Sequence, residues 1–292
     1  MTAAARPPAR LTAAPAPLRI GDTLFEWGSR TYVMGVINAT PDSFSGDGVL
    51  DPSMVAARAC AMVEDGASLI DVGAESSRPG RHSVDADEEW GRLGPVLRAV
   101  RAAVAVPVTV DTTKAAVAER AFDAGADALN DINGLRGDSD LAALLGRRGC
   151  PALLMHNQRG RGFSGDVIAD IAAGLEVSLA IAKQAGLSRD AVMLDPGFGF
   201  GWEVEQNLEM LRRLAELKAL GRPLLIGTSR KSTIGAVLGR PEGERRWGTA
   251  ATVALAAQAG VDIVRVHDVR EMADVARMAD AVARGTVARE RS

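Results

Sequence analysis

A repeating unit constrains the fold of this 292-residue chain more than any other feature. Short apolar segments that end in a polar residue alternate with segments of helical periodicity. Three of the predicted helices end in a glycine, the residue that favours the position just after a helix. Each glycine is followed five residues later by a polar residue inside an apolar segment; the pairs are Gly66 and Asp71, Gly125 and Asn130, and Gly260 and Arg265. Alternating strands and helices of this kind predict a parallel sheet.

The number of units favours a closed barrel. We expect eight strands and eight main helices in an α/β chain whose length suits one (β/α)8 TIM barrel of about 250 residues with an extension. An open doubly wound sheet remains compatible with the pattern alone. The strands are expected at residues 32–37, 69–73, 108–111, 129–132, 152–156, 192–195, 224–231 and 261–267.

The chain is predicted to form one domain between two irregular ends. Residues 1–17 are rich in Ala, Pro and Arg, so we expect a disordered extension, with a transit peptide as the weaker alternative. Residues 18–285 form the barrel domain, which opens with a β-hairpin over residues 18–33. That hairpin could plug the bottom of the barrel or form a surface flap. Residues 286–292 are expected to be a frayed tail.

Composition excludes some classes of partner. The formal net charge is −3 and no basic stripe is present, so we expect neither a nucleic-acid partner nor binding to a membrane surface. No segment has the roughly 18 apolar residues that a membrane span requires. Cys60 and Cys150 lack the spacing of a metal site and predict reduced thiols in a cytoplasmic protein.

Polar residues at the strand ends mark the expected site. In (β/α)8 barrels, function lies at the carboxyl ends of the strands. Asp111, Asn130 and Asp195 would suit a ligand rich in N–H donors, whereas a structural role is favoured for Asp71 and Asp131. For His156 the two interpretations are equally balanced.

Two segments predict anion binding. Residues 227–231 place hydroxyl groups and two cations before a short helix, where free N–H groups favour an anion. Arg265 and His267 lie on one face of the last strand, and a phosphate or diphosphate would suit that pair. With three histidines and no metal-binding spacing, a zinc enzyme is not expected.

Eight motifs in order resemble the dihydropteroate synthase family. They are MGVINATPDSFS (34–45), DVGAESSRPG (71–80), VDT (110–112), NDI (130–132), LMH (154–156), LDPGFGFG (194–201), SRKS (229–232) and RVHDV (265–269). The resemblance implies a (β/α)8 barrel, and an enzyme of folate biosynthesis that joins 4-aminobenzoate to 6-hydroxymethyl-7,8-dihydropterin diphosphate and releases pyrophosphate. It also implies a Mg2+ cofactor and a cytoplasmic homodimer.

The family motifs imply roles for particular residues. The pterin ring would be held by Asp111, Asn130, Met155, Asp195, Phe200 and Lys231, and its diphosphate by Asn38, Ser77, Arg265 and His267. Asn38 would also bind Mg2+. The aminobenzoate would meet Phe44, Ser77, Arg78, Pro79 and Ser229. Asp111, Lys231, Arg265 and His267 would be the catalytic residues.

Three departures from the family pattern and two alternative functions accompany this hypothesis. The loop carboxylate is shifted by one position to Asp47, Ser77 replaces a common Thr, and Trp202 replaces a common Lys. The alternatives are a methyltransferase that uses methyltetrahydrofolate and a pterin-binding paralogue without turnover. The methyltransferase would not need the two anion sites, and the paralogue would be expected to have lost strand-end residues.

Overall fold

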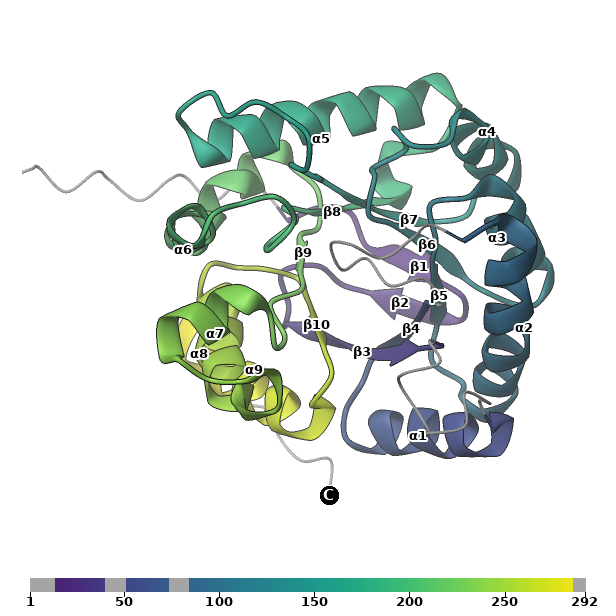
Figure 1. Cartoon of the computed structure of the whole chain (residues 1–292), viewed down its shortest axis with the longest axis horizontal. Coiled ribbons are helices and arrows are strands. Elements are labelled where there is room, and N and C mark those ends of the chain that lie inside the picture. Colours follow the sequence, from purple (N-terminus) through teal and green to yellow (C-terminus); the bar gives the residue numbers. More distant parts are fainter. Residues whose placement is uncertain (1–13, 40–50, 74–83, 286–292) are drawn as a thin grey trace, which may run out of the picture.

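Eight parallel strands surrounded by helices form the body of the protein (Figure 1). The computed structural model describes residues 14–39, 51–73 and 84–285. The strands of the large sheet follow the order β8-β7-β6-β5-β4-β3-β10-β9. A parallel bridge between Leu194 and Leu224 joins the two outer strands, β8 and β9, so the sheet closes. The closed barrel is therefore confirmed, and the open doubly wound sheet is excluded.

The elements have the following bounds. The barrel strands are β3 Tyr32–Asn38, β4 Leu69–Gly73, β5 Val108–Asp111, β6 Ala128–Asp131, β7 Ala152–Met155, β8 Val192–Asp195, β9 Leu225–Ile226 and β10 Ile263–Val266. The helices are α1 Pro52–Glu64, α2 Ala86–Ala103, α3 Ala115–Asp123, α4 Ser139–Arg148, α5 Val167–Gln184, α6 Val204–Arg212, α7 Ser232–Leu238, α8 Arg246–Gln258 and α9 Val269–Arg284. Short 3-10 helices span Arg189–Ala191, Leu214–Leu220 and Glu242–Glu244.

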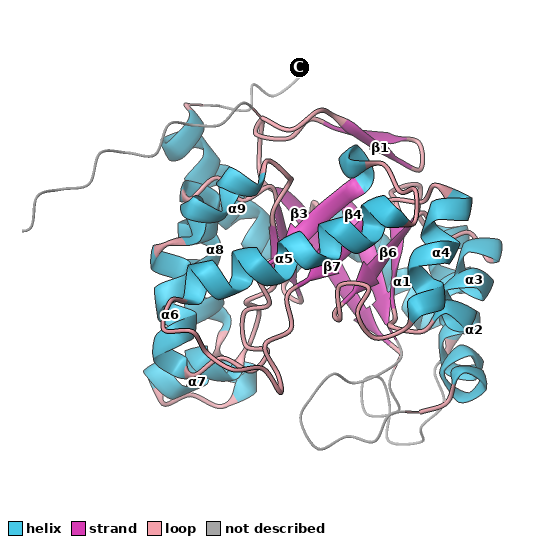
Figure 2. Ribbon diagram, turned by 90° about the horizontal axis from the view of Figure 1, so that it is seen from above, coloured by secondary structure: helices cyan, strands magenta, loops and turns pink. Residues whose placement is uncertain are grey.

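The N-terminal hairpin closes the bottom of the barrel. Strands β1 (Leu18–Ile20) and β2 (Thr23–Phe25) pair in antiparallel fashion, and Figure 2 places β1 at one end of the barrel, away from α7. Ile20, Phe25 and Trp27 are buried against side chains from the lower barrel interior. Those interior residues are Tyr32, Met34, Leu69, Ala128, Leu153, Met193, Leu225 and Ile263. The hairpin is thus the predicted plug rather than a surface flap.

Strand alternation separates an outer apolar layer from an inner polar one. Successive side chains in a strand point to opposite faces, so every second residue points into the barrel. On β4, Ile70 and Val72 pack among the surrounding helices, whereas Leu69 belongs to the lower interior cluster. Asp71, two residues further along β4, points to the same side as Leu69 and is fully buried. Asp71, Asp111, Asn130 and Arg265 therefore collect in the upper half of the interior.

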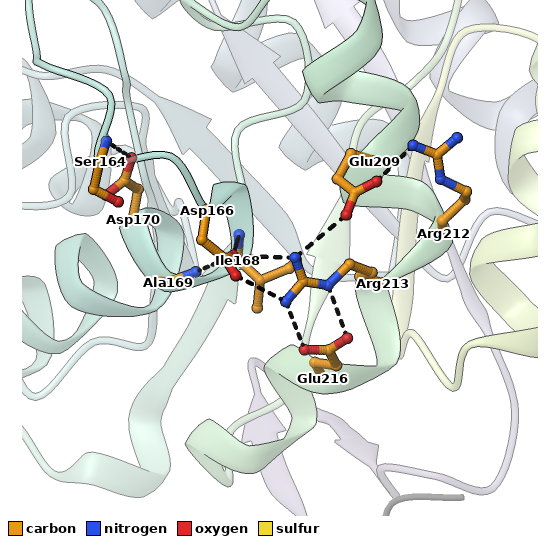
Figure 3. Close-up of polar contacts among 9 residues, drawn as sticks. All are labelled: Ser164, Asp166, Ile168, Ala169, Asp170, Glu209, Arg212, Arg213 and Glu216. Carbon is orange, nitrogen blue, oxygen red and sulfur yellow. Dashed lines mark hydrogen bonds and ion pairs between the residues drawn. The ribbon is translucent and has the colours of Figure 1, made fainter. Parts of the chain in front are cut away.

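Three details differ from the sequence analysis. Helix α4, which Asp138 caps by accepting a hydrogen bond from the backbone N–H of Asp140, brings the α-helices of the described residues to nine, one more than the eight expected. Strand β9 spans only two residues, because the chain turns at residues 227–231. The helical segment after β8 is not one continuous α-helix: α6 ends at Arg212, a 3-10 helix begins at Leu214, and the guanidinium of Arg213 between them contacts Asp166, Glu209 and Glu216 (Figure 3).

The glycine endings of the helices are confirmed. Gly66, Gly125 and Gly260 have φ angles of +107°, +99° and +81°, a region that residues with a Cβ rarely adopt. Each glycine turns the chain directly into the next buried strand.

Candidate active site

Asp71 is the centre of a buried polar network inside the barrel. Its Oδ2 atom accepts hydrogen bonds from Asn130 Nδ2 at 3.0 Å and from Arg265 Nε at 2.6 Å. Its Oδ1 atom accepts a hydrogen bond from the hydroxyl of Thr109. The Asp71 side chain is fully buried, so these three donors replace the water that its charge would otherwise require. Asp71 therefore holds neighbouring side chains in place, as the structural interpretation expected.

Arg265 also reaches Asp111, at the end of β5. Its Nη2 atom lies 2.9 Å from Asp111 Oδ2, whereas its Nη1 atom makes no hydrogen bond to the described residues. Burial and the nearby charge of Asp71 raise the pKa of Asp111 to about 7, although Arg265 opposes that rise. Burial lowers the pKa of the Arg265 guanidinium, but the charges of Asp71 and Asp111 raise it, and the net change is upward. Asp111 is thus a carboxyl group whose charge is sensitive to a ligand at neutral pH.

Strand register places Asn38 at the level of Asp111. Asn38 pairs with Gly73, and Gly73 pairs with Asp111 on the next strand. A Cβ atom at Gly73 would lie 3.0 Å from the Cβ of Asp111, so glycine leaves room between the two polar side chains. Asn38 is half-buried at the mouth of the barrel. An amide group and a carboxyl group therefore face the same space from β3 and β5.

Asp195 and Lys231 lie on the far side of that space, with Phe200 beneath the lysine. The turn after β8 is fixed by the backbone N–H of Gly197, which donates to Asp195 Oδ1 at 2.7 Å. Lys231 Nζ lies 3.9 Å from the centre of the Phe200 ring. Gly199, with φ +79°, leaves space for the lysine stem, since a Cβ there would lie 3.1 Å from Lys231 Cδ.

Burial moves the pKa values of this pair toward each other. Burial raises the pKa of Asp195 to about 6, against the hydrogen bond from Gly197 and the charge of Lys231. Burial and Arg265 lower the pKa of Lys231 to about 7, although Asp195 opposes that change. An acid and a base with pKa values near neutrality inside one cleft are typical of a functional site. Met155 is also buried here, close to the turn at Gly197.

Ser229 orients the ring of His267. The backbone N–H of His267 donates to Ser229 Oγ at 3.2 Å, and His267 Nδ1 lies 2.9 Å from the same oxygen. Burial and the charge of Arg265 lower the pKa of His267 to about 4, so the ring is neutral at pH 7. If the serine hydroxyl donates to Nδ1, the ring proton is on Nε2, which is then available to a ligand.

Arg230, between Ser229 and Lys231, points away from the site. Its φ angle is +58°, a conformation that is costly for a residue with a side chain. Its guanidinium pairs with Asp268 at 2.5 Å, and its backbone N–H donates to the hydroxyl of Thr249 at 3.1 Å. The sequence analysis placed two cations of residues 227–231 together as an anion site. That expectation is wrong for Arg230, because its charge is neutralised outside the barrel.

His156 also lies outside the site. Its Nε2 atom is 2.8 Å from Gln158 Oε1, and its ring lies 5.8 Å from that of Trp202. A Cβ atom at Gly174 would be 2.0 Å from His156 Nδ1, so the ring fills the space between β7 and α5. Of the two interpretations of His156, the structural one is correct.

We expect His156 to make folding stability depend on pH. Burial lowers its pKa to about 4, below the ordinary value of 6.5, so the unfolded chain takes up a proton first as the pH falls. The contribution of the neutral His156 ring to the free energy of unfolding is therefore complete above pH 6.5 and is lost as the pH falls toward 4. Between about pH 7 and about pH 5, the wild-type protein should lose roughly 2 kcal/mol more than His156→Gln in urea unfolding. Equal losses in the two proteins would contradict this assignment.

Four predicted site residues lie outside the described residues: Phe44, Ser77, Arg78 and Pro79. The same holds for Asp47. Among the residues that the structure does describe, no three His, Cys, Asp or Glu side chains are placed to hold a metal ion. A search of the described helices found none that is long and apolar enough to cross a membrane.

Sequence reasoning missed one residue at the mouth of the barrel. The guanidinium of Arg159, in the loop after β7, lies 4.7 Å from the centre of the Phe200 ring. This loop is rich in Gly and Arg, but nothing in the sequence indicates which arginine faces the site.

Comparisons with known proteins agree with this geometry. A family model described as pterin binding enzyme matches residues 34–267. The dihydropteroate synthase of Synechocystis sp. is 44% identical over 276 residues, which cover 92% of this chain and 96% of the relative. That of Bacillus subtilis is 44% identical over 256 residues, which cover 87% and 89%.

Solved structures give the same result. Dihydropteroate synthase from Clostridium difficile, in the presence of pteroic acid, has a TM-score of 0.86 and 46% identity, covering 89% of this chain and 99% of that one. The Xanthomonas albilineans dihydropteroate synthase with 4-aminobenzoic acid has a TM-score of 0.87 and 36% identity, covering 92% and 98%.

The barrel and its polar mouth thus define a pterin-binding enzyme. Within that class, the chain belongs to the dihydropteroate synthase family, and it is a transferase of folate biosynthesis. The methyltransferase alternative is therefore set aside.

Proposed function

We propose that this enzyme joins 4-aminobenzoate to the methylene carbon of 6-hydroxymethyl-7,8-dihydropterin diphosphate and releases pyrophosphate. The observation that carries the proposal is the pair formed by Asp195 and Lys231 at the carboxyl ends of the strands: the lysine lies over Phe200, and each charge shifts the pKa of the other. Relatives with known structures support the choice of substrates, since their descriptions include pteroic acid, 4-aminobenzoic acid and 7,8-dihydropteroate.

The pterin ring would lie against Phe200 and Met155. Asp195 would accept hydrogen bonds from the amino group and a ring N–H, and Lys231 would donate to a ring acceptor. Asn130 and Asp111 would complete the contacts. Support comes from the burial of Asn130, Asp195 and Met155, which leaves little water to compete for these donors and acceptors.

The diphosphate would lie on the opposite side, between β3 and β10. The unused Nη1 atom of Arg265 and the Nε2 atom of His267 could donate to its oxygens, with Asn38 and Ser77 as further partners. As the C–O bond breaks, its electron pair moves onto the diphosphate, and these donors would offset the growing charge. Asp111 would stabilise the positive charge that develops on the methylene carbon.

The second substrate would enter from the mouth of the barrel. Its amine nitrogen would bond to the methylene carbon that the departing diphosphate leaves, and the proton released from nitrogen would pass to water, so no covalent enzyme intermediate is needed. Phe44, Ser77, Arg78, Pro79 and Ser229 are proposed to form its pocket. Because Ser229 already holds His267, it would link the aminobenzoate site to the diphosphate site.

Mg2+ is proposed as the cofactor, and the residues present are suited to it in one respect. The side-chain oxygen of Asn38 is a hard ligand at the right edge of the barrel, and Mg2+ in such sites is commonly held by substrate phosphates with few protein groups. When bound, Mg2+ would lower the charge of the leaving diphosphate.

The decisive experiment is a synthesis assay with purified protein, both substrates and MgCl2. We expect dihydropteroate and pyrophosphate in equal amounts, loss of turnover with excess EDTA, and recovery when Mg2+ is restored. If the protein binds the pterin diphosphate but forms no product, the paralogue without turnover is the correct interpretation.

We also propose a homodimer that forms through the helices after β9. Val237, Leu238, Trp247, Leu255, Met278 and Val282 on α7, α8 and α9 are all about half exposed or more. Met278 and Val282 of α9 line one surface groove with Ala254 of α8, and a contiguous exposed apolar patch commonly marks an interface. Sedimentation equilibrium should give a mass near twice the 30.5 kDa of the chain. A cytoplasmic location is proposed as well, supported by the unpaired thiols of Cys60 and Cys150.

A further inference from the structure

Two cations share the Phe200 ring at the mouth of the barrel. Lys231 Nζ lies 3.9 Å from the ring centre, and the Arg159 guanidinium carbon lies 4.7 Å from it. Each contact is a favourable cation–π interaction, but the two positive charges repel each other. That repulsion contributes to the lowered pKa of Lys231, after burial and Arg265. An anion at this point would relieve it.

No carboxylate of the described residues neutralises Arg159. Lys231 has Asp195 nearby, and Arg265 is paired with Asp71 and Asp111. Arg159, in contrast, has only the Phe200 ring as a side-chain partner in the described part of the chain. Arg159 is exposed at the mouth of the barrel, and partial burial lowers the pKa of its guanidinium. A charge in that position is suited to binding an anionic ligand.

The backbone around Arg159 is held in place rather than free to adjust. The backbone N–H of Gln158 donates to the carbonyl of Phe200 at 3.1 Å, which joins the loop after β7 to the loop after β8. Gly201, with φ +85°, allows this approach, because a Cβ there would lie 2.5 Å from the Arg159 nitrogen. The side chain of Gln158 is tied in turn to His156 and to the carbonyl of Gly162.

The far end of the same loop is fixed as well. Asp166 caps α5 by accepting hydrogen bonds from the backbone N–H groups of Ile168 and Ala169. Arg213 reaches Asp166 from the end of α6, with both contacts at 3.2 Å (Figure 3). A loop fixed at both ends loses little conformational entropy when a ligand binds.

Strand order indicates which anion Arg159 would meet. In the closed ring, β7 is four positions from β3 and two positions from β9. The proposed diphosphate site at β3 and β10 is therefore across the barrel, whereas Ser229 and Lys231, which follow β9, are nearer. Of the residues proposed for the aminobenzoate site, Ser229 is the one on this nearer side.

We propose that Arg159 binds an anionic group of a substrate, and that this group is the carboxylate of 4-aminobenzoate. The inference rests on the proposed function, because it concerns the second substrate of that reaction. Arg159 would then act with Phe200 and Ser229 to position 4-aminobenzoate and to make the enzyme prefer an arylamine that carries a carboxylate.

The test compares Arg159→Gln with the wild-type enzyme in steady-state synthesis. We expect the KM for 4-aminobenzoate to rise about five- to tenfold, as for the loss of one charged hydrogen bond at a partly exposed site. The KM for the pterin diphosphate should stay within about twofold. With 4-aminobenzamide, which has no carboxylate, kcat/KM should be the same for both proteins. Arg159→Lys should recover part of the affinity, since it restores the charge.

Arg161→Gln is the matched control, because Arg161 is an exposed arginine in the same loop with no contact to Phe200. It should leave both KM values unchanged. The inference is wrong if Arg159→Gln leaves the KM for 4-aminobenzoate unchanged, or if 4-aminobenzamide shows the same loss. It is also wrong if Arg161→Gln has the same effect, or if only the KM for the pterin diphosphate rises.

Calorimetric binding of 4-aminobenzoate, with pyrophosphate, Mg2+ and a pterin present, separates the two proposals. A wild-type protein without turnover would refute the proposed function. Weaker binding to Arg159→Gln than to Arg161→Gln would still support the contact with the carboxylate, and equal binding would overturn it.

Discussion

Replacing Lys231 with alanine is expected to lower kcat/KM for the pterin diphosphate by about a hundred- to a thousandfold. The lysine is the proposed donor to the pterin ring, and it lies over Phe200 opposite Asp195. Removing it deletes a charged hydrogen bond within a largely dehydrated cleft and takes away one of the two cations that lower the pKa of Asp195. The fold should persist, because α7 begins after this residue and Lys231 has no side-chain hydrogen bond within the described residues.

Asp195→Asn tests the other half of the same pair. An asparagine can still accept the hydrogen bond from Gly197 N–H, which is 2.7 Å long in the wild-type protein, so the turn after β8 should be preserved. It would, however, present an N–H group where the pterin requires an acceptor. We expect a loss of kcat/KM of the same order as for Lys231→Ala, with a weaker binding of the pterin itself.

Both variants need a check of folding and a neutral comparison. Circular dichroism and the urea midpoint should match the wild-type protein within the error of the measurement. Lys183→Ala removes an exposed lysine near the end of α5 and should leave the rate unchanged. Near-normal kcat/KM in either site variant would refute the assignment of this pair to the pterin.

The barrel itself could be predicted from the sequence because its signals are local. Glycines at the ends of helices and short apolar strands recur at regular spacing, and each signal depends only on neighbouring residues. The plug, by contrast, depends on Ile20 and Phe25 meeting side chains from the lower ends of most of the barrel strands. A sequence pattern could indicate a hairpin, but it could not decide where the hairpin packs.

The site was predictable as a set of strand ends but not as a set of contacts. Arg265 and Asp71 are 194 residues apart, and their pairing follows from the closure of the sheet. The ring of His156 can point toward α5 only because Gly174 has no side chain there. The side chain of Arg230 points outward because its backbone has a positive φ angle, and its N–H donates to the hydroxyl of Thr249. Such choices are made by tertiary packing, and single-residue preferences do not encode them.

Removing the carboxylate of Asp71 is expected to have the largest effect on stability. In Asp71→Ala, Thr109, Asn130 and Arg265 each lose an acceptor, and of the two ion pairs that Arg265 makes with described residues only the one with Asp111 remains. Breaking a buried ion pair by removing one partner typically costs about 3–5 kcal/mol, because the remaining charge is left without compensation. Urea unfolding at pH 7 should show a loss of that order, and turnover should fall with it because Arg265 is no longer held in one orientation.

Asp123→Ala is the control for this variant, since Asp123 makes an ion pair with Arg148 at 2.7 Å on the protein surface. Water can replace that contact, so the cost should be under about 1 kcal/mol. If Asp71→Ala yields no folded protein, Thr109→Val tests the same network, because it removes one donor to Asp71 while keeping the shape of the side chain. A loss of about 1–3 kcal/mol is then expected. Stabilities equal to the wild-type value for both Asp71→Ala and Thr109→Val would mean that Arg265 and Asn130 are held in place without Asp71.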